Sequence, residues 1–300
     1  MTRRFHTLDV FTGRALTGNP LAVVLDAEGL DDQRMQAIAR EFNLSETVFV
    51  GASAHPDNLA SLRIFTPGRE IPFAGHPTVG TAVLLGLLNP NGAREFILEE
   101  KIGVVSCDVQ VLGPDHGHAT FTLPRLPECI GALPDNTTLA AGLGLQEGDI
   151  GFGTYKPGLY SAGNPFRCVP LRSRDAVSRA CPQGEAFARA FDVGTDGFTN
   201  AFVYCADPID PAHAFHARMF APSVGVPEDP ATGAAAAAFA GAFMDAEKPA
   251  DGHHTFVIEQ GDAMGRPSRI TVSIDVVDGR LREAQIGGQA VIVSEGRLRA

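Results

Sequence analysis

Three ionisable residues, Glu46, His76 and Asp229, stand in sequence contexts that suit chemistry on a small molecule. Glu46 lies in NLSETVFV, between an amphipathic stretch and a strand-like run. His76 and Asp229 each precede a proline at the start of an apolar, helix-like run. Carboxylates and imidazoles are common general acids and bases in enzymes. We therefore interpret the three residues as candidate proton-transfer groups.

The contexts of His76 and Asp229 resemble each other. RIFTPGREIPFAGHPTVGTA begins at Arg63, and RMFAPSVGVPEDPATGAAAAA begins at Arg218. The two segments are offset by 155 residues at their arginines and by 153 at His76 and Asp229. A weaker third match relates TGNPLAVVL to AGNPFRCVPL at an offset of 145. Ordered matches at similar offsets predict two related halves.

Two helix-like runs, Thr78–Leu88 and Ala231–Ala246, are apolar on every side. Such a helix must be covered on every side, and a curled sheet is the natural cover where strand-like runs are frequent. An amphipathic helix is expected at Asp31–Phe42, with an interrupted counterpart at Ser178–Phe191. Strands are expected at Phe5–Val10, Leu21–Leu25, Thr47–Val50, Leu62–Phe65, Glu95–Glu99, Gly103–Val111, Ala119–Leu123, Ala201–Cys205, Ala217–Phe220, Thr255–Glu259, Arg269–Val277 and Ala290–Ser294.

We therefore predict an α+β fold of two pseudo-symmetric, barrel-like halves. Each half is expected to be a curled, mostly antiparallel sheet around a central apolar helix. The first is expected over residues 1–122 and the second over residues 123–278. Residues 279–300 are expected to pack back on the first half, partly on the strength of the resemblance described below.

The composition is that of a globular protein with a substantial core: 300 residues, 44% hydrophobic and 20% charged, with a formal net charge of −11. An acidic chain is a poor candidate for binding nucleic acid or an anionic membrane. No run reaches the ~20 apolar residues of a membrane span, and the first residues lack a secretory pattern. Five cysteines without a C-x-x-C pair fit a reducing compartment, so we expect a cytoplasmic protein.

Cofactor and metal motifs give no positive signal. DHGH at Asp115–His118 and the pair His253–His254 lack the spacing of a zinc site, and we interpret both as solvated loops. The glycine-rich runs lack the strand-turn-helix context of a dinucleotide fingerprint, and no nucleophile elbow is present. The residues therefore predict no metal and no nucleotide cofactor.

The two apolar helices suggest an anion site. A helix start presents unpaired backbone N–H groups and about half a positive charge. Proline is favourable at the first helical position, and Asp229 is expected to be the N-cap of its helix. If a pseudo-two-fold relates the halves, both helix starts face one cleft between them. That cleft would bind a carboxylate.

Each candidate also has a simpler structural interpretation. Asp229 would be only a cap, His76 a satisfied buried histidine, and Glu46 an exposed charge at a strand end. The functional interpretation is favoured because His76 and Asp229 occupy equivalent places in the repeat yet differ chemically. Two purely structural caps would be expected to resemble each other.

The chain resembles the phenazine-biosynthesis isomerase family, often called PhzF-like, which has a diaminopimelate-epimerase-like fold. The resemblance covers nearly the whole chain. It rests on DVFTGRALTGNPLAVV, EFNLSETVFV, RIFTPGREIPFAGHPTVGTA, RMFAPSVGVPEDPATGAAA, GRPSRI and IGGQAVIVSEGRL, in that order.

This resemblance implies a cofactor-free, commonly homodimeric enzyme that moves a proton on the carbon skeleton of a small carboxylate-bearing metabolite. It implies that Glu46 is the principal acid and base, with His76 and Asp229 as further catalytic residues. The implied substrate-binding residues are Ser45, Gly75, Gly233 and Ala234. The halves of the family's members can close on a ligand.

Two departures bear on the substrate and the mechanism. The family often has DPATGS, whereas this chain has DPATGA, so Ala234 keeps a backbone N–H but lacks a hydroxyl. Related amino-acid epimerases carry a cysteine at each helix start. The corresponding places here hold Gly75-His76 and Asp229, which disfavours a two-thiol racemase.

Three functions remain open from the sequence. The leading one is an isomerase with Glu46 as base and then acid. The second is an epimerase that uses Glu46 and Asp229 from opposite faces, which would change configuration without moving a double bond. The third is a non-catalytic small-molecule binding protein. The set of three ionisable groups argues against the third, and the loss of the hydroxyl at Ala234 keeps it open.

Overall fold

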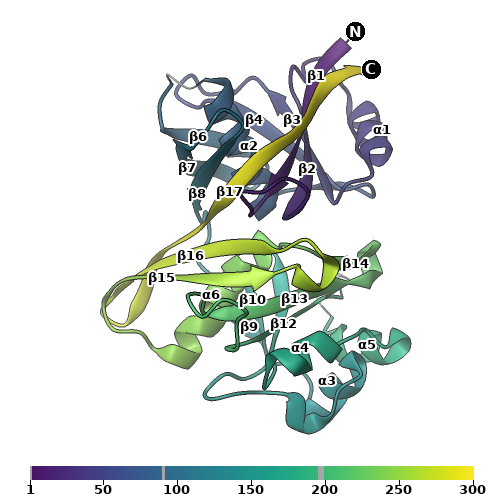
Figure 1. The fold of residues 1–300 in the computed structure, drawn as a ribbon, viewed down its shortest axis with the longest axis vertical. Coiled ribbons are helices and arrows are strands. Elements are labelled where there is room, and N and C mark those ends of the chain that lie inside the picture. The colour runs from purple at the N-terminus through teal and green to yellow at the C-terminus, as the bar shows by residue number, and fades with distance from the viewer. Residues whose placement is uncertain (1, 90–91, 195–198) are drawn as a thin grey trace. The chain divides into compact units, whose positions relative to one another are not determined.

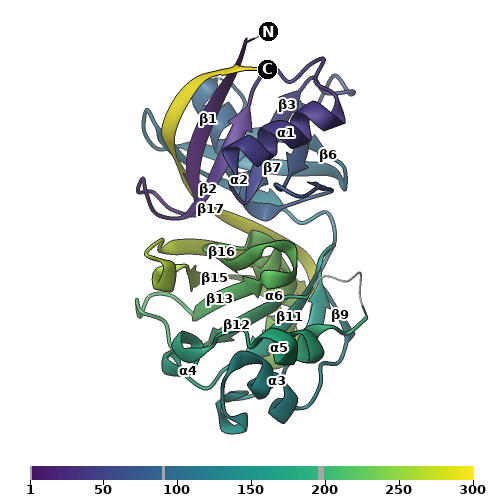
Figure 2. The ribbon, with the colours of Figure 1, turned by 90° about the vertical axis from the view of Figure 1, so that its right-hand side faces the viewer.

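The computed structural model describes residues 2–89, 92–194 and 199–300. The chain forms two compact units (Figures 1 and 2). Unit 1 comprises Met1–Pro124 and Gln285–Ala300, and unit 2 comprises Arg125–Ala284. The C-terminal segment therefore belongs to the same unit as the N-terminus.

Unit 1 is a closed ring of strands. The ring follows the order β1–β2–β3–β4–β6–β7–β8–β17 and returns to β1. The pairs β2–β3 and β4–β6 are parallel and the others are antiparallel. The strands are β1 (Thr2–Val10), β2 (Asn19–Val24), β3 (Glu46–Gly51), β4 (Ala60–Phe65), β6 (Glu95–Glu100), β7 (Gly103–Val111), β8 (His116–Thr122) and β17 (Arg280–Arg299), with β5 (Glu70–Ile71) added to β4.

Helix α2 (Gly75–Leu88) fills this ring, and its first ten residues are all buried. It packs against β1, β2, β3, β7 and β8. The fit is close at Gly80, where an added Cβ would lie 2.6 Å from Leu21 Cδ2 and 2.7 Å from Val10 Cγ2. This helix needs no polar face, because strands of the ring surround it.

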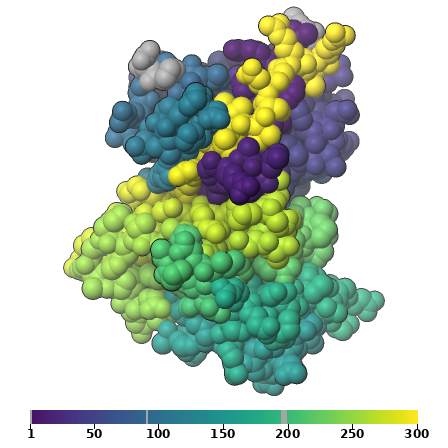
Figure 3. All heavy atoms as spheres, viewed as in Figure 1, coloured from purple at the N-terminus to yellow at the C-terminus, as the bar shows by residue number. Residues whose placement is uncertain are grey.

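Helix α1 (Asp32–Phe42) lies outside the ring and packs on β3 and β4. Asp31 caps its start by accepting a hydrogen bond from the backbone N–H of Arg34. The terminal strand β17 lies between β1 and β8, and Figure 3 shows it in yellow on the surface of unit 1.

Unit 2 repeats the strand order and the central helix of unit 1. Its strands pair in the order β9–β10–β11–β12–β13–β15–β16, and the pairs β11–β12 and β13–β15 are parallel, like β2–β3 and β4–β6. The central helix is α6 (Gly233–Glu247), which packs on β9, β10, β11 and β16. The strands are β9 (Glu128–Gly131), β10 (Gly158–Ser161), β11 (Pro165–Pro170), β12 (Ala201–Cys205), β13 (Phe215–Ala221), β14 (Val226–Asp229), β15 (Gly252–Gln260) and β16 (Ser268–Val277).

A second layer covers the outside of unit 2. It consists of α3 (Asn136–Leu143), α4 (Arg174–Arg179) and α5 (Gly184–Phe191), which share a hydrophobic cluster with β11 and β12 (Figure 2). Three short 3₁₀ turns complete the described elements: η1 (Glu147–Asp149), η2 (Pro222–Val224) and η3 (Asp262–Met264).

Strand register confirms the internal repeat. Thr47 pairs with Phe65 in unit 1, and Ala201 pairs with Phe220 in unit 2. The two pairs are offset by 154 residues in the first strand and 155 in the second. Equivalent positions in the two units can therefore be matched residue by residue.

The arginines of the repeated motif have the same role in both units. Arg63 Nε donates to Glu70 Oε1 at 2.8 Å, and its guanidinium lies 5.2 Å from the ring centre of Phe65. Arg218 Nε donates to Glu228 Oε1 at 2.8 Å, and its guanidinium lies 4.7 Å from the phenylalanine two residues further on. The motif thus joins the strand before each central helix to the short strand that leads into it.

The predicted helix starts were wrong by a few residues. Helix α2 begins at Gly75, so Pro77 is its third residue rather than its first. Helix α6 begins at Gly233 with Thr232 as N-cap, so Asp229 is not the cap but the last residue of β14. Strand β14 extends to Asp229, which leaves the capping position three residues later.

Among the described residues, none of the helices is both long and apolar enough to cross a membrane. The five cysteines are free thiols, of which three are buried.

Candidate active site

The structure brings Glu46 and His76 together inside unit 1. Glu46 is the first residue of β3, and His76 is the second residue of α2. His76 Nε2 lies 3.4 Å from Glu46 Oε2, and their side chains are 5% and 17% exposed. A largely desolvated carboxylate beside an imidazole is a pair suited to proton transfer.

A third residue, Asn19, holds the histidine ring from β2. Asn19 Nδ2 lies 3.3 Å from His76 Nδ1, and both side chains are buried. Burial lowers the pKa of His76 to about 3, and a hydrogen bond to the backbone of Pro20 acts weakly in the opposite direction. His76 is therefore neutral at physiological pH, and a neutral imidazole can donate with one ring nitrogen and accept with the other.

The same site contains the start of α2. Its N-cap, Ala74, makes no side-chain capping bond, and the first turn carries no acidic residue. The dipole of the helix therefore presents its positive end at Gly75 and His76 without a cap carboxylate to neutralise it. Ser45, half-buried, directly precedes Glu46 and β3.

Unit 2 fixes Asp229 at the start of α6. Asp229 is buried, and its Oδ2 accepts a hydrogen bond from Thr232 Oγ1 at 2.5 Å. Gln260 Nε2 donates to the Asp229 carbonyl at 2.7 Å, and Gln260 Oε1 accepts from the Thr232 N–H at 3.1 Å. Gly233 is the first residue of the helix and Ala234, half-buried, is the second.

The counterpart of Glu46 in unit 2 is Asn200, since these residues precede the equivalent positions Thr47 and Ala201. Asn200 is fully buried; its Oδ1 accepts from the Arg167 N–H at 3.1 Å and its Nδ2 donates to the carbonyl of the residue at position 165 at 3.0 Å. A neutral amide held by these hydrogen bonds cannot act as a general acid or base. The repeat therefore carries an ionisable acid at this position only in unit 1.

Sequence reasoning missed Asn19, Thr232 and Gln260. Asn19 lies in the repeated GNP motif, so the repeat itself was a signal for it. Thr232 lies beside the recognised aspartate. Gln260 gave no local signal, because its contacts with α6 depend on the pairing of β13 with β15.

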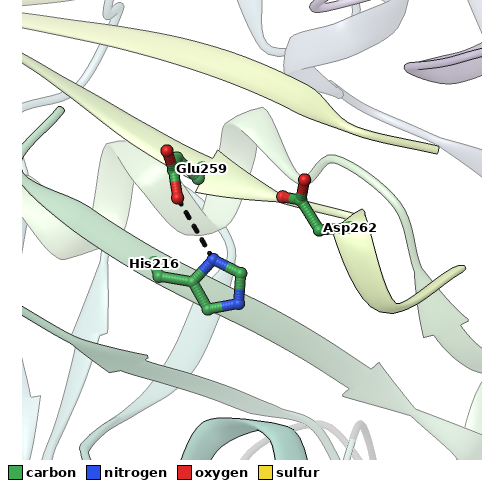
Figure 4. A group of neighbouring side chains, drawn as sticks. All are labelled: His216, Glu259 and Asp262. Carbon is green, nitrogen blue, oxygen red and sulfur yellow. Dashed lines mark hydrogen bonds and ion pairs between the residues drawn. The ribbon is translucent and has the colours of Figure 1, made fainter. Parts of the chain in front are cut away.

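A second cluster of ionisable side chains lies elsewhere in unit 2, at His216, Glu259 and Asp262 (Figure 4). Their possible ligand atoms lie within 4.8 Å of one another, beside a cavity of about 560 Å³ that His216 and Asp262 help to line. The sequence did not predict this cluster. Arg174 and Arg218 line the same cavity, which disfavours a cation there.

Glu259 stabilises the loop that precedes β13 by hydrogen bonds. It accepts from the N–H groups of Ile209 at 2.6 Å and Asp210 at 2.8 Å, and its contacts with His213 Nδ1 and His216 Nδ1 measure 2.7 Å and 3.3 Å. Burial acts to raise the pKa of Glu259, but these bonds lower it overall. We interpret the cluster as structural.

A test of the environment of His76 follows from its lowered pKa. Between pH 3 and 6.5 the unfolded chain binds a proton that the native imidazole excludes, so this contribution to stability is present above pH 6.5 and is lost as the pH falls toward 3. The loss approaches about 1.4 kcal/mol per pH unit. Urea unfolding of the His76→Gln variant between pH 4 and 7 should lack this dependence. The control His253→Gln, at an exposed site, should retain it; equal slopes for all three proteins would contradict a buried, neutral His76.

The hydroxyproline epimerase of Agrobacterium vitis has a similar fold, with a TM-score of 0.64 at 13% identity over 99% of this chain and 92% of that one. The two barrel-and-helix units thus define a protein of the diaminopimelate-epimerase-like fold, as the sequence predicted.

Residues 8–296 match the family described as "Phenazine biosynthesis-like protein". An uncharacterized isomerase of Mesorhizobium japonicum is 46% identical over 299 residues, which are 99% of either chain. The trans-2,3-dihydro-3-hydroxyanthranilate isomerase of Pseudomonas aeruginosa is 33% identical over 304 residues, 98% of either chain. A PhzF-family protein of Bacillus anthracis has a TM-score of 0.88 at 27% identity, with full coverage of both chains. The chain belongs to the phenazine biosynthesis-like (PhzF) family and is an isomerase of that family.

Proposed function

We propose that this chain moves a proton between carbon atoms of a small carboxylate-bearing metabolite, with Glu46 as the general base and then the general acid. The observation that carries this proposal is the buried pair of Glu46 Oε2 and His76 Nε2, 3.4 Å apart at the start of α2. The proposal needs no cofactor, because one carboxylate can accept a proton and return it.

In this mechanism, the Glu46 carboxylate takes a proton from a carbon next to a double bond. The electron pair of the broken C–H bond shifts the double bond by one position. Protonated Glu46 then returns the proton to the carbon at the other end of the system, so no atom is gained or lost. The N-terminal N–H groups of α2 offset negative charge that develops on the substrate.

Three residues of unit 2 complete the set of site residues that the family resemblance implies. We propose that Asp229, which precedes α6, is a further catalytic residue, and that Gly233 and Ala234 at the start of α6 bind substrate oxygens. Asp229 is supported in this role by its burial and by the hydrogen bond that fixes its carboxylate. Ser45 and Gly75 would contact the substrate from unit 1.

The substrate class that we propose is a small cyclic carboxylate, as in the relative named trans-2,3-dihydro-3-hydroxyanthranilate isomerase. Ala234 lacks the serine hydroxyl that the family often carries at this position. The substrate of this chain would therefore have one hydrogen-bonding group fewer, or a different one, near α6. We also propose a cytoplasmic homodimer, following the family resemblance.

The test is a search for exchange at carbon. The wild-type protein is incubated in heavy water with trans-2,3-dihydro-3-hydroxyanthranilate and a pool of cyclic and amino-acid carboxylates, and mass spectrometry identifies the compound that gains deuterium. Proton NMR then shows whether a double bond has moved or a stereocentre has inverted. Inversion alone would favour the epimerase alternative, and tight binding without exchange would favour a binding protein.

Replacing Asp229 with asparagine should reduce turnover by about tenfold to a hundredfold, less than a change at Glu46, because Asn keeps the shape and loses the charge. It should also destabilise the protein by about 1–2 kcal/mol, since the Thr232 hydroxyl loses its charged acceptor. Steady-state kinetics and urea unfolding measure the two effects. Asp245→Asn, at the far end of α6, is the control for helix charge; equal turnover losses in both variants would remove Asp229 from the site.

A further inference from the structure

A buried glutamate that the proposed mechanism does not use lies against the first turn of α2. Glu100 is the last residue of β6 and is 7% exposed. Its Oε1 lies 2.7 Å from Thr78 Oγ1, and Thr78 Oγ1 lies 2.8 Å from the carbonyl oxygen of Ala74, the N-cap of α2. These three groups form a continuous chain of short contacts at the start of the helix.

The number of protons shared by Glu100, Thr78 and the Ala74 carbonyl decides whether Glu100 is protonated or ionised. The Thr78 hydroxyl has one proton and can donate to only one of its two neighbours. If Glu100 were ionised, both neighbours would be acceptors and one contact would carry no hydrogen bond. If Glu100 is protonated, it donates to Thr78 Oγ1, which donates to the Ala74 carbonyl, and both contacts are hydrogen bonds.

The internal repeat supplies an independent check. Ser61 pairs with Glu99 in unit 1, and His216 pairs with Glu259 in unit 2, so the next residues, Glu100 and Gln260, are equivalent. The side chain at the Glu100 position is thus a glutamine in unit 2, which is neutral at every pH.

Gln260 takes part in an equivalent series of hydrogen bonds. Gln260 Nε2 donates to Thr232 Oγ1 at 3.1 Å, and Thr232 Oγ1 donates to Asp229 Oδ2 at 2.5 Å. In each unit, a side chain from the end of the equivalent strand donates to a threonine at the start of the central helix. A protonated glutamate is the closest ionisable mimic of glutamine, since both have one donor side and one acceptor side.

We propose that Glu100 is a positioning residue that acts as a neutral carboxylic acid. Its O–H···Thr78 O–H···O=C Ala74 chain fixes the first turn of α2, and with it His76 and the backbone N–H groups of the helix start. Its neutrality also leaves the positive end of the helix dipole available to the substrate carboxylate, a role that rests on the proposed function.

The surroundings of Glu100 agree with this state. Burial raises the pKa of Glu100 to about 8, and the hydrogen bond with Thr78 opposes this only weakly. From β7, the titratable group that interacts with it is the Cys107 thiol, whose pKa is raised by burial and by Glu100. Lys101, which follows β6 directly, pairs with Glu70 at 3.2 Å. Glu100 Oε2 has no hydrogen-bond partner among the described residues, which penalises an ionised carboxylate further.

The neighbouring Glu99 is a matched control. Hydrogen bonds from Ser53, Ala54 and Asn58 lower the pKa of Glu99 to about 2. The two adjacent glutamates therefore titrate on opposite sides of the usual value, although they belong to the same strand.

Carbon-13 NMR of protein labelled at the glutamate carboxyl carbons tests the protonation state directly, without a substrate. In the wild-type protein one resonance should titrate with a midpoint near pH 8. This resonance should be absent from Glu100→Gln and present in Glu99→Gln. A wild-type spectrum in which every glutamate has finished titrating below pH 6 would overturn the proposal.

Unfolding equilibria give a second readout. Between the ordinary glutamate pKa and pH 8 the native protein holds a proton that the unfolded chain has lost, so stability is greatest at low pH and is lost as the pH rises to about 8. The unfolding constant of the wild-type protein should rise by up to tenfold per pH unit relative to that of Glu100→Gln. Glu100→Ala should be less stable than Glu100→Gln at every pH, because it cannot donate to Thr78; equal stability of these two variants would remove the positioning role.

The electrostatic role is tested by kinetics with trans-2,3-dihydro-3-hydroxyanthranilate. The KM of the wild-type and Glu99→Gln proteins should rise by threefold to tenfold between pH 7 and 9 while kcat changes little, and the rise should be absent from Glu100→Gln. A rise of the same size in Glu100→Gln would refute this role. If no turnover occurs, the proposed function fails on this substrate, whereas the NMR and unfolding results still decide whether Glu100 is neutral and positions α2.

Discussion

Replacing Glu46 with glutamine is expected to lower the turnover number by about 10²–10⁴-fold. Glutamine has the shape of glutamate but cannot accept a proton from carbon and return it. The side chain is 17% exposed and lies 3.4 Å from His76 Nε2, so bulk water is poorly placed to replace it. In the proposed site the start of α2 still faces the substrate's charge, so the affinity for a substrate analogue should stay within about tenfold.

Two further variants and a check of folding make this prediction specific. Glu46→Asp keeps the acid but withdraws it by one methylene, and should retain more activity than Glu46→Gln. Glu41→Gln changes an exposed glutamate at the end of α1 and should leave turnover unchanged. A loss of turnover caused by unfolding would not test the role of Glu46, so circular dichroism must show that the Glu46→Gln protein is folded. A folded variant with wild-type turnover would contradict the prediction.

Replacing Phe239 with alanine is expected to destabilise unit 2 by about 3–5 kcal/mol. Phe239 lies in the middle of α6 and is fully buried. Its ring centre lies 4.7 Å from that of Tyr204 on β12 and 4.8 Å from that of Phe215 on β13, both in edge-to-face geometry. Removal of the ring leaves a cavity between the central helix and its covering sheet, and rigid strands cannot collapse to fill it.

Phe243, one helical turn later, is the control for this prediction. It is half-buried, and its main aromatic contact is Phe256 at 4.5 Å. Phe243→Ala should therefore cost less than half as much as Phe239→Ala. Urea unfolding followed by circular dichroism measures both, and equal losses would mean that α6 is not enclosed as described.

Much of the fold was predictable, because its central elements have strong sequence signals. Two helices that are apolar on every side require a covering sheet, and the repeated arginine and proline motifs mark equivalent places in the two halves. Strand β11 was missed because Arg167 interrupts its apolar run; this arginine is fully buried and donates to the carbonyl of Phe191 at 3.0 Å. The short strands β5, β9, β10 and β14 have two to four residues, too few for a pattern.

The C-terminal strand shows another limit of sequence patterns. Only Ala290–Ser294 was predicted, whereas β17 covers Arg280–Arg299. The pair Gly287-Gly288 looks like a strand breaker in the sequence. In the structure, a Cβ at Gly287 would lie 2.6 Å from Thr120 Oγ1, so glycine permits the close approach of β17 to β8.

The candidate site was predictable in its residue types but not in its contacts. Glu46 and His76 come together through the parallel pairing of β2 with β3 and the central position of α2, and no local spacing encodes either. The sequence predicts a cap at Asp229 because aspartate is a preferred cap residue, whereas the cap is Thr232. The contact of Asn19 with His76 is not predictable from the sequence, because asparagine before proline is typical of a turn.

The most direct test of the central claim is deuterium incorporation into the substrate by Glu46→Gln protein in heavy water. The substrate is the compound that the wild-type protein labels, and Glu41→Gln is run beside it as the matched control. We expect Glu41→Gln to label carbon at the wild-type rate and folded Glu46→Gln to label it at least a hundredfold more slowly. Labelling by folded Glu46→Gln at the wild-type rate would contradict the account and move the proton transfer to His76 or Asp229.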